Sequence, residues 1–167
     1  MDAKAATARG LALRETINRN LDKARALADG VLLEFGPFRE QDLALRDRIR
    51  DWQPNLRMIF ITRLVLWKYR ARAPGFELPE AIHPAQEEFD NRLAKALEGM
   101  ADRTEGNESP QKQDLSEAYA QLEQAAWKGS PKTQNQFSPQ TKSFLLLSRR
   151  IALLADSLEK EIVDTSR

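Results

Sequence analysis

Hydrophobic residues recur along most of the chain at intervals of three and four positions, the period of an α-helix that buries one face. In the first segment this stripe consists of Ile17, Leu21, Ala24, Ala28, Val31 and Phe35. Gly36-Pro37 should end the helix, because glycine suits the position after a helix end and proline cannot continue a helix. No alternating pattern typical of β-strands occurs, so we expect an all-α protein.

A second helix is expected from about Arg39. Its stripe consists of Leu45, Ile49, Trp52, Leu56, Ile59, Arg63, Leu66 and Arg70. Pro54 should kink or split this helix, because proline removes one backbone donor and clashes with the preceding turn.

The most apolar run of the chain, Leu56–Trp67, lies in this second helix and has nine hydrophobic residues among twelve. It is too short to cross a membrane, since a spanning helix needs about 20 apolar residues. Its apolar residues occur on nearly every side of the helix, so we expect a central helix enclosed by its neighbours.

Three more amphipathic helices are expected in the rest of the chain. A third should begin near Pro84, and its stripe consists of Phe89, Leu93, Ala96 and Met100. After a polar loop at about 104–113, Ser109-Pro110 could open a fourth helix, whose stripe consists of Leu115, Tyr119, Leu122 and Ala126. A linker at about 129–140 precedes the last helix, which should start after Ser138-Pro139.

The last helix has a stripe of Phe144, Leu147, Ile151, Leu154 and Leu158. Five such helices with short connections predict an antiparallel helical bundle of about five amphipathic helices, and we expect one domain over residues 1–167.

Composition narrows the possible chemistry. The 167 residues include no cysteine, so disulfides and thiolate metal sites are excluded, and His83 is the single histidine. The net charge of +1 predicts no overall attraction to nucleic acid.

Charge is unevenly distributed. Residues 38–76 carry nine Lys/Arg against four Asp/Glu, a balance of +5, and residues 77–127 carry four against twelve, a balance of −8. The favoured interpretation is a set of solvated helix faces that attract one another weakly. The alternative is a basic face that lies near anionic lipid.

The chain contains no nucleotide-binding, zinc-protease or serine-hydrolase motif. Glu87, Glu88 and Asp90 follow His83 and could form a metal site, but a solvated helix face is the favoured interpretation. Glu34 could be a proton carrier if it is partly buried, although an ion pair with Arg39 is favoured. We therefore assign no catalytic, cofactor-binding or metal-binding residue and expect no cofactor.

Aromatic and arginine side chains alternate in the second helix. Trp52, Trp67 and Tyr69 could stack on a ligand, although aromatic residues at helical spacing more often belong to a core. Any buried arginine of this helix would need a carboxylate partner. The arginines concerned are Arg57, Arg63 and Arg70, and the candidate partners are Asp29, Glu34 and Asp90.

The segment Leu13–Phe60 carries a family resemblance. Its distinctive pieces are Ala28-Asp29-Gly30-Val31, Glu34-Phe35-Gly36-Pro37 and Trp52-Gln53-Pro54, and the likeness continues through Leu64–Tyr69 and Pro74–Pro79. The segment resembles the extramembrane region of the fusaric acid resistance (FUSC) family, in particular its multidrug efflux members. The resemblance covers roughly residues 10–105, and the final helix fits only as a generic helical tail.

That resemblance implies a soluble helical region on the cytoplasmic face of a bacterial inner membrane, excised from a protein with two membrane-embedded halves. Its implied partners are the transmembrane part of the same protein, a periplasmic adaptor, an outer-membrane channel and a second copy of itself. We expect a regulatory or assembly role in efflux of drugs or aromatic acids, without catalysis.

Two other functions are weighed. A helical sensor could bind a small aromatic carboxylate between Trp52, Arg63 and Trp67. An enzyme using Glu34 or the group around His83 ranks last.

Overall fold

The computed structural model describes residues 3–31, 36, 38–72, 78–107, 112–129 and 137–165. Their α-helices are α1 (Ala3–Gly30), α2 (Arg39–Arg72), α3 (His83–Thr104), α4 (Leu115–Gly129) and α5 (Pro139–Thr165), and a 3-10 helix, η2 (Glu80–Ile82), precedes α3. No strand occurs in these ranges, so the predicted all-α helical bundle is confirmed. None of the helices, as far as they are described, is apolar over a length that could cross a bilayer.

The chain divides into two compact units, unit 1 (Met1–Arg57) and unit 2 (Met58–Arg167). Helix α2 contributes its first part to unit 1 and its last part to unit 2. The single domain expected from the sequence stays a prediction.

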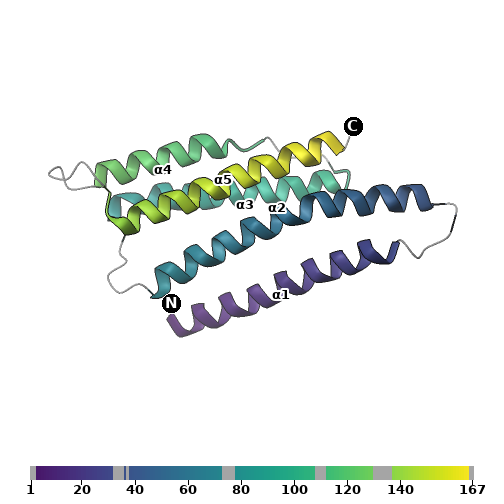
Figure 1. Cartoon of the computed structure of the whole chain (residues 1–167). Coiled ribbons are helices and arrows are strands. Elements are labelled where there is room, and N and C mark those ends of the chain that lie inside the picture. The colour runs from purple at the N-terminus through teal and green to yellow at the C-terminus, as the bar shows by residue number, and fades with distance from the viewer. Residues whose placement is uncertain are drawn as a thin grey trace. The chain divides into compact units, whose positions relative to one another are not determined.

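The core of unit 2 lies between α3, α4 and α5, which pack pairwise against one another, with η2 against α3 and α4. In Figure 1, α4 (green) runs antiparallel to α3 (teal) and to α5 (yellow-green). The most deeply buried side chains are Ile82, Phe89, Leu115, Leu122, Phe144 and Ile151. Burial of each of these side chains stabilises the fold by about 1.5–3 kcal/mol relative to leaving it exposed, so this seam holds unit 2 together.

The stripes expected for α3, α4 and α5 face this core. Phe89, Leu93 and Met100 are buried on α3, and Leu122 and Ala126 on α4. On α5 the buried members of the stripe are Phe144, Ile151 and Leu158. The helical spacing therefore identified the core-facing side of all three helices.

Side chains and one glycine fix the helix ends in unit 2. The Asp114 carboxylate accepts a hydrogen bond of 2.8 Å from the Glu117 backbone N–H and caps α4, which begins at Leu115. The expected opening at Ser109-Pro110 lies outside the described residues. The Ser138 hydroxyl likewise accepts from the Thr141 N–H at 3.1 Å and caps α5 where the sequence predicted its start.

Helix α3 ends in a turn that requires glycine. Gly106 has a φ of +79°, a left-handed conformation that other residues adopt only with strain. Its N–H donates to the Arg103 carbonyl, and the Asn107 N–H donates to the Asp102 carbonyl, which is the Schellman pattern.

Unit 1 consists of α1 and the first part of α2. The Gln53 side-chain amide donates a hydrogen bond of 2.7 Å to the Leu21 carbonyl, and Leu21 and Ala28 are buried. Helix α1 ends at Gly30, six residues before the predicted Gly36-Pro37 stop. Glycine is a poor helix former, and Gly30 interrupts the pattern before Gly36 is reached.

Helix α2 departs from the sequence prediction in two ways. It runs through Pro54 as one helix, so the expected split is wrong, whereas a kink there stays a prediction. The run Leu56–Trp67 is not enclosed on nearly every side, because Ile61 and Val65 are 41% and 46% exposed. The buried positions of this run are Ile59, Thr62 and Leu66, which repeat at the helical period and form one face.

Gly129, the last residue of α4, lies where an added side chain would disturb the packing. A Cβ atom there would lie 2.9 Å from the Pro79 Cβ, which a rigid proline ring cannot avoid by rotating. We expect Gly129→Ala to lower the free energy of unfolding by about 1–3 kcal/mol, measured by urea denaturation.

Gly30→Ala is the matched control, because no heavy atom lies within 4 Å of its added Cβ. Alanine should be neutral or stabilising there by up to about 1 kcal/mol. Equal effects of the two substitutions would show that the contact with Pro79 is unimportant.

Candidate functional site

The three residues predicted to bind a ligand belong to different units. Trp52 lies in unit 1, whereas Arg63 and Trp67 lie one helical turn apart in unit 2. All three are partly buried, and the Trp52 indole Nε1 is buried without a hydrogen-bond partner among the described residues. A joint site of these residues stays a prediction.

Arg63 is engaged by a carboxylate, as the sequence predicted. Its Nη1 donates a hydrogen bond of 2.6 Å to Asp90 Oδ1 on α3, and the side chains of Arg63 and Asp90 are 38% and 28% exposed. This pair joins the last part of α2 to α3 within unit 2.

The other arginines of α2 follow the expectation less closely. Arg57 lies 3.7 Å from Asp22 on α1 instead of pairing with Asp29, Glu34 or Asp90. The side chain of Arg70 and the whole of Glu34 lie outside the described residues, as does the Tyr69 side chain.

The acidic group near His83 is only partly exposed, because Asp90 is partly buried in its pair with Arg63. His83, Glu87 and Glu88 are exposed, and no group of three potential ligands close enough to hold a metal ion occurs in the described part of the chain.

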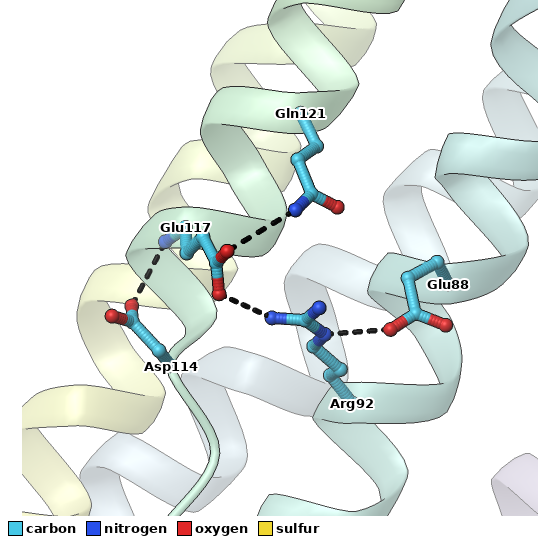
Figure 2. A network of polar contacts seen from close by, with 5 residues as sticks. All are labelled: Glu88, Arg92, Asp114, Glu117 and Gln121. Atoms are coloured by element: carbon cyan, nitrogen blue, oxygen red, sulfur yellow. Dashed lines mark hydrogen bonds and ion pairs between the residues drawn. The ribbon is translucent and has the colours of Figure 1, made fainter.

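Glu88 belongs instead to a polar network between α3 and α4 (Figure 2). Arg92 donates from Nε to Glu88 at 2.6 Å and from Nη1 to Glu117 at 2.8 Å. Both hydrogen bonds raise the pKa of the Arg92 guanidinium, and the bond to Glu88 has the larger effect. Glu117 also accepts from Gln121, and its backbone is capped by Asp114, so the network ties the start of α4 to α3.

A second cluster surrounds Glu159 on α5, whose side chain is only 8% exposed. Its two carboxylate oxygens lie 2.9 Å from Arg103 and 3.0 Å from Lys112. A carboxylate this deeply buried is stable only with such partners, so Glu159 holds Arg103, near the end of α3, and Lys112 against α5.

Asp156 lies beside this cluster. Burial raises the pKa of its carboxyl, and the positive charge of Lys112 opposes that shift. Ser116 donates a hydrogen bond of 3.5 Å to it, and the nearby charges of Glu159 and Asp114 raise the pKa further.

Unit 1 contains a groove between α1 and the first part of α2, with a volume of about 590 Å³. Its lining includes four arginines, Arg25, Arg46, Arg50 and Arg57. The rest of the lining is Ala28, Asp29, Ile49, Gln53 and Pro54. We call it the arginine groove.

The sequence contained a signal for this groove in the spacing of its polar residues, which the spacing of hydrophobic residues does not reveal. Arg46, Arg50, Gln53 and Arg57 are spaced by four, three and four, so they share one face of α2. Only a partner helix bearing Arg25 and Asp29 turns that face into a concave site, and this pairing requires the fold.

Comparisons with known proteins add no relative: no family model, no curated protein and no solved structure matches the chain.

The Arg63–Asp90 contact should appear as a coupling energy. In a double-mutant cycle of Arg63→Gln and Asp90→Asn, we expect about 0.5–1 kcal/mol in urea denaturation, because the pair is half-exposed and hydrogen-bonded. The coupling should fall when salt is raised.

The matched control is a second cycle that pairs Arg63 with Glu87, an exposed carboxylate on the same helix as Asp90. Arg63→Gln with Glu87→Gln should show no coupling. Comparable coupling in both cycles would mean that Arg63 senses only the general negative charge of α3.

Asp156 should make stability depend on pH in a defined direction. Its pKa is raised by folding, so its contribution is fully present below the ordinary aspartate pKa of about 3.9 and is lost as pH rises through the folded value. Asp156→Asn should therefore gain stability relative to the natural protein as pH rises from about 3 to 7. Urea denaturation across that range tests this, and a variant that loses relative stability on going to neutral pH would contradict it.

Proposed function

We propose that this chain is a non-catalytic helical domain of an inner-membrane efflux protein of the fusaric acid resistance type, with a role in regulation or assembly at the cytoplasmic face. The observation that carries the proposal is the sequence resemblance over Leu13–Phe60, extended through residue 105. The all-helical architecture is compatible with it.

The contacts in unit 2 suit a scaffold. Arg92 and Glu159 join helices through charge-assisted hydrogen bonds around an apolar seam. In this proposal, the membrane-embedded part of the same protein carries out transport, with a periplasmic adaptor and an outer-membrane channel. The helical domain couples to that part and pairs with a second copy through an exposed helix face.

The alternative, a sensor for an aromatic carboxylate at Trp52, Arg63 and Trp67, is weakened by the contact of Arg63 with Asp90. A carboxylate ligand would have to displace Asp90 from a hydrogen bond of 2.6 Å and leave that acid partly buried without its partner.

The efflux proposal is tested in the natural reading frame that encodes this chain. We expect the encoded protein to fractionate with membranes and to confer resistance to aromatic acids or drugs. Removal of residues 1–167 should abolish resistance while the remaining protein stays in the membrane. Recovery of the intact protein in the soluble fraction would contradict the proposal.

Glu87→Gln with His83→Ala is the control for a non-catalytic role. Both side chains are exposed, so resistance should be unchanged at equal protein level. Loss of resistance with this pair would favour chemistry at the acidic group.

A further inference from the structure

The arginine groove concentrates positive charge on a concave surface. Four guanidinium groups line it against the single carboxylate of Asp29. Arginine presents a planar fork of N–H donors that matches the oxygens of a carboxylate or a phosphate. The chemistry of the lining therefore favours an oxyanion.

The acids that pair with Arg25 and Arg57 do so only at long range. Asp29 lies 3.9 Å from Arg25, and Asp22 lies 3.7 Å from Arg57, both beyond hydrogen-bond distance.

On the α2 side of the groove, Arg46 is held by its neighbour Asp47, whose Oδ1 accepts from both Nε and Nη2. Arg50 has no ion pair or hydrogen bond within the described ranges and is exposed. Arg50 is thus the donor most available to a ligand, with Arg46 one helical turn away.

The groove also has an apolar part. Ala28 from α1 and Ile49 and Pro54 from α2 line it beside the arginines. Its volume lies within the range of about 300–1,000 Å³ that is usual for sites of small molecules. A ligand with both an anionic group and an apolar body would use both parts of the lining.

We propose that the arginine groove binds a small organic anion, with its carboxylate or phosphate oxygens on Arg50 and Arg46 and its apolar body against Ala28, Ile49 and Pro54. The inference depends only on the geometry of unit 1, and it holds or fails independently of the efflux proposal.

The test is a titration of the full chain with small anions, in which binding is measured by ¹H–¹⁵N NMR of the arginine side chains and by calorimetry. The soluble probes are inorganic phosphate, phenyl phosphate and benzoate. Vesicles of phosphatidylglycerol, with phosphatidylcholine vesicles as the neutral reference, provide the same phosphate chemistry on a lipid headgroup. The two arms separate a dissolved ligand from a membrane surface.

Arg50→Gln is the principal variant, and Arg48→Gln is its matched control. Arg48 is an exposed arginine on the same helix that does not line the groove, so the two substitutions change the net charge equally. We expect Arg50→Gln to weaken phenyl phosphate binding about ten-fold or more, since it removes a charge-assisted hydrogen bond, and Arg48→Gln to weaken it less than about two-fold. Arg25→Gln provides a second groove variant, and circular dichroism verifies that each variant folds.

Phenyl phosphate should bind more tightly than inorganic phosphate because of the apolar lining. Binding to phosphatidylglycerol vesicles with the same dependence on Arg50 would assign the anion to a lipid. The proposal is overturned if no probe binds at millimolar concentration, if Arg48→Gln weakens binding as much as Arg50→Gln, or if the phenyl group adds no affinity.

Discussion

The exclusion of water from the seam between α3, α4 and α5 is the interaction on which unit 2 depends. None of these helices can bury its apolar face alone, and most helical stability in proteins comes from tertiary packing of such a face. Phe89, Leu122 and Ile151 come from three different helices and are almost completely buried together. The helices therefore form stable structure as a set.

Hydrophobic burial is not directional, so the polar contacts at the edge of the seam decide the register. Arg92 binds Glu88 on its own helix and Glu117 on α4, which fixes where α4 begins along α3 (Figure 2). Glu159 forms ion pairs with Arg103 and Lys112, which fixes α5 near the C-terminal end of α3. Each pair contributes little energy by itself, yet a shift of one helical turn would leave the buried Glu159 carboxylate without partners.

The existence of the five helices and the core-facing sides of the last three followed from the spacing of hydrophobic residues. The spacing did not predict burial correctly where the burial of a side chain depends on how many neighbours cover it. Leu45 and Leu56 continue the stripe of α2 but are 51% and 39% exposed. The helical period identifies a face, whereas burial of that face depends on what packs against it.

Capping residues stand directly before α4 and α5, but the sequence analysis singled out only the one before α5. Ser138 precedes Pro139 directly and gave the correct start of α5. For α4, Ser109-Pro110 offered an equally good local signal, but Asp114 is the residue whose carboxylate reaches the backbone N–H of Glu117. Ser109-Pro110 lies outside the described residues, whereas Asp114 directly precedes α4 and is of a residue type preferred at that position.

The candidate site shows the same limit. The Arg63–Asp90 pair could be predicted because a partly buried arginine needs an acid and few acids were available. The arginine groove could not, because the spacing of Arg46, Arg50 and Arg57 is also that of an ordinary solvated helix face. The opposing helix α1 distinguishes the two, and no local pattern encodes which helix lies opposite.

The same groove bears on the stability of unit 1. Leu21 and Ala28 are the hydrophobic residues buried in its described part, so its two helices gain far less from burial than those of unit 2. Arginines that face one another across a groove also repel, which lowers the stability of the helix pair further. An anion bound between them removes that repulsion and binds only when the two helices are paired. At a concentration 100 times its dissociation constant, such a ligand adds about 2.7 kcal/mol to the paired state. That gain is comparable to burial of one large side chain, so occupancy of the groove would control whether unit 1 is a firm helix pair.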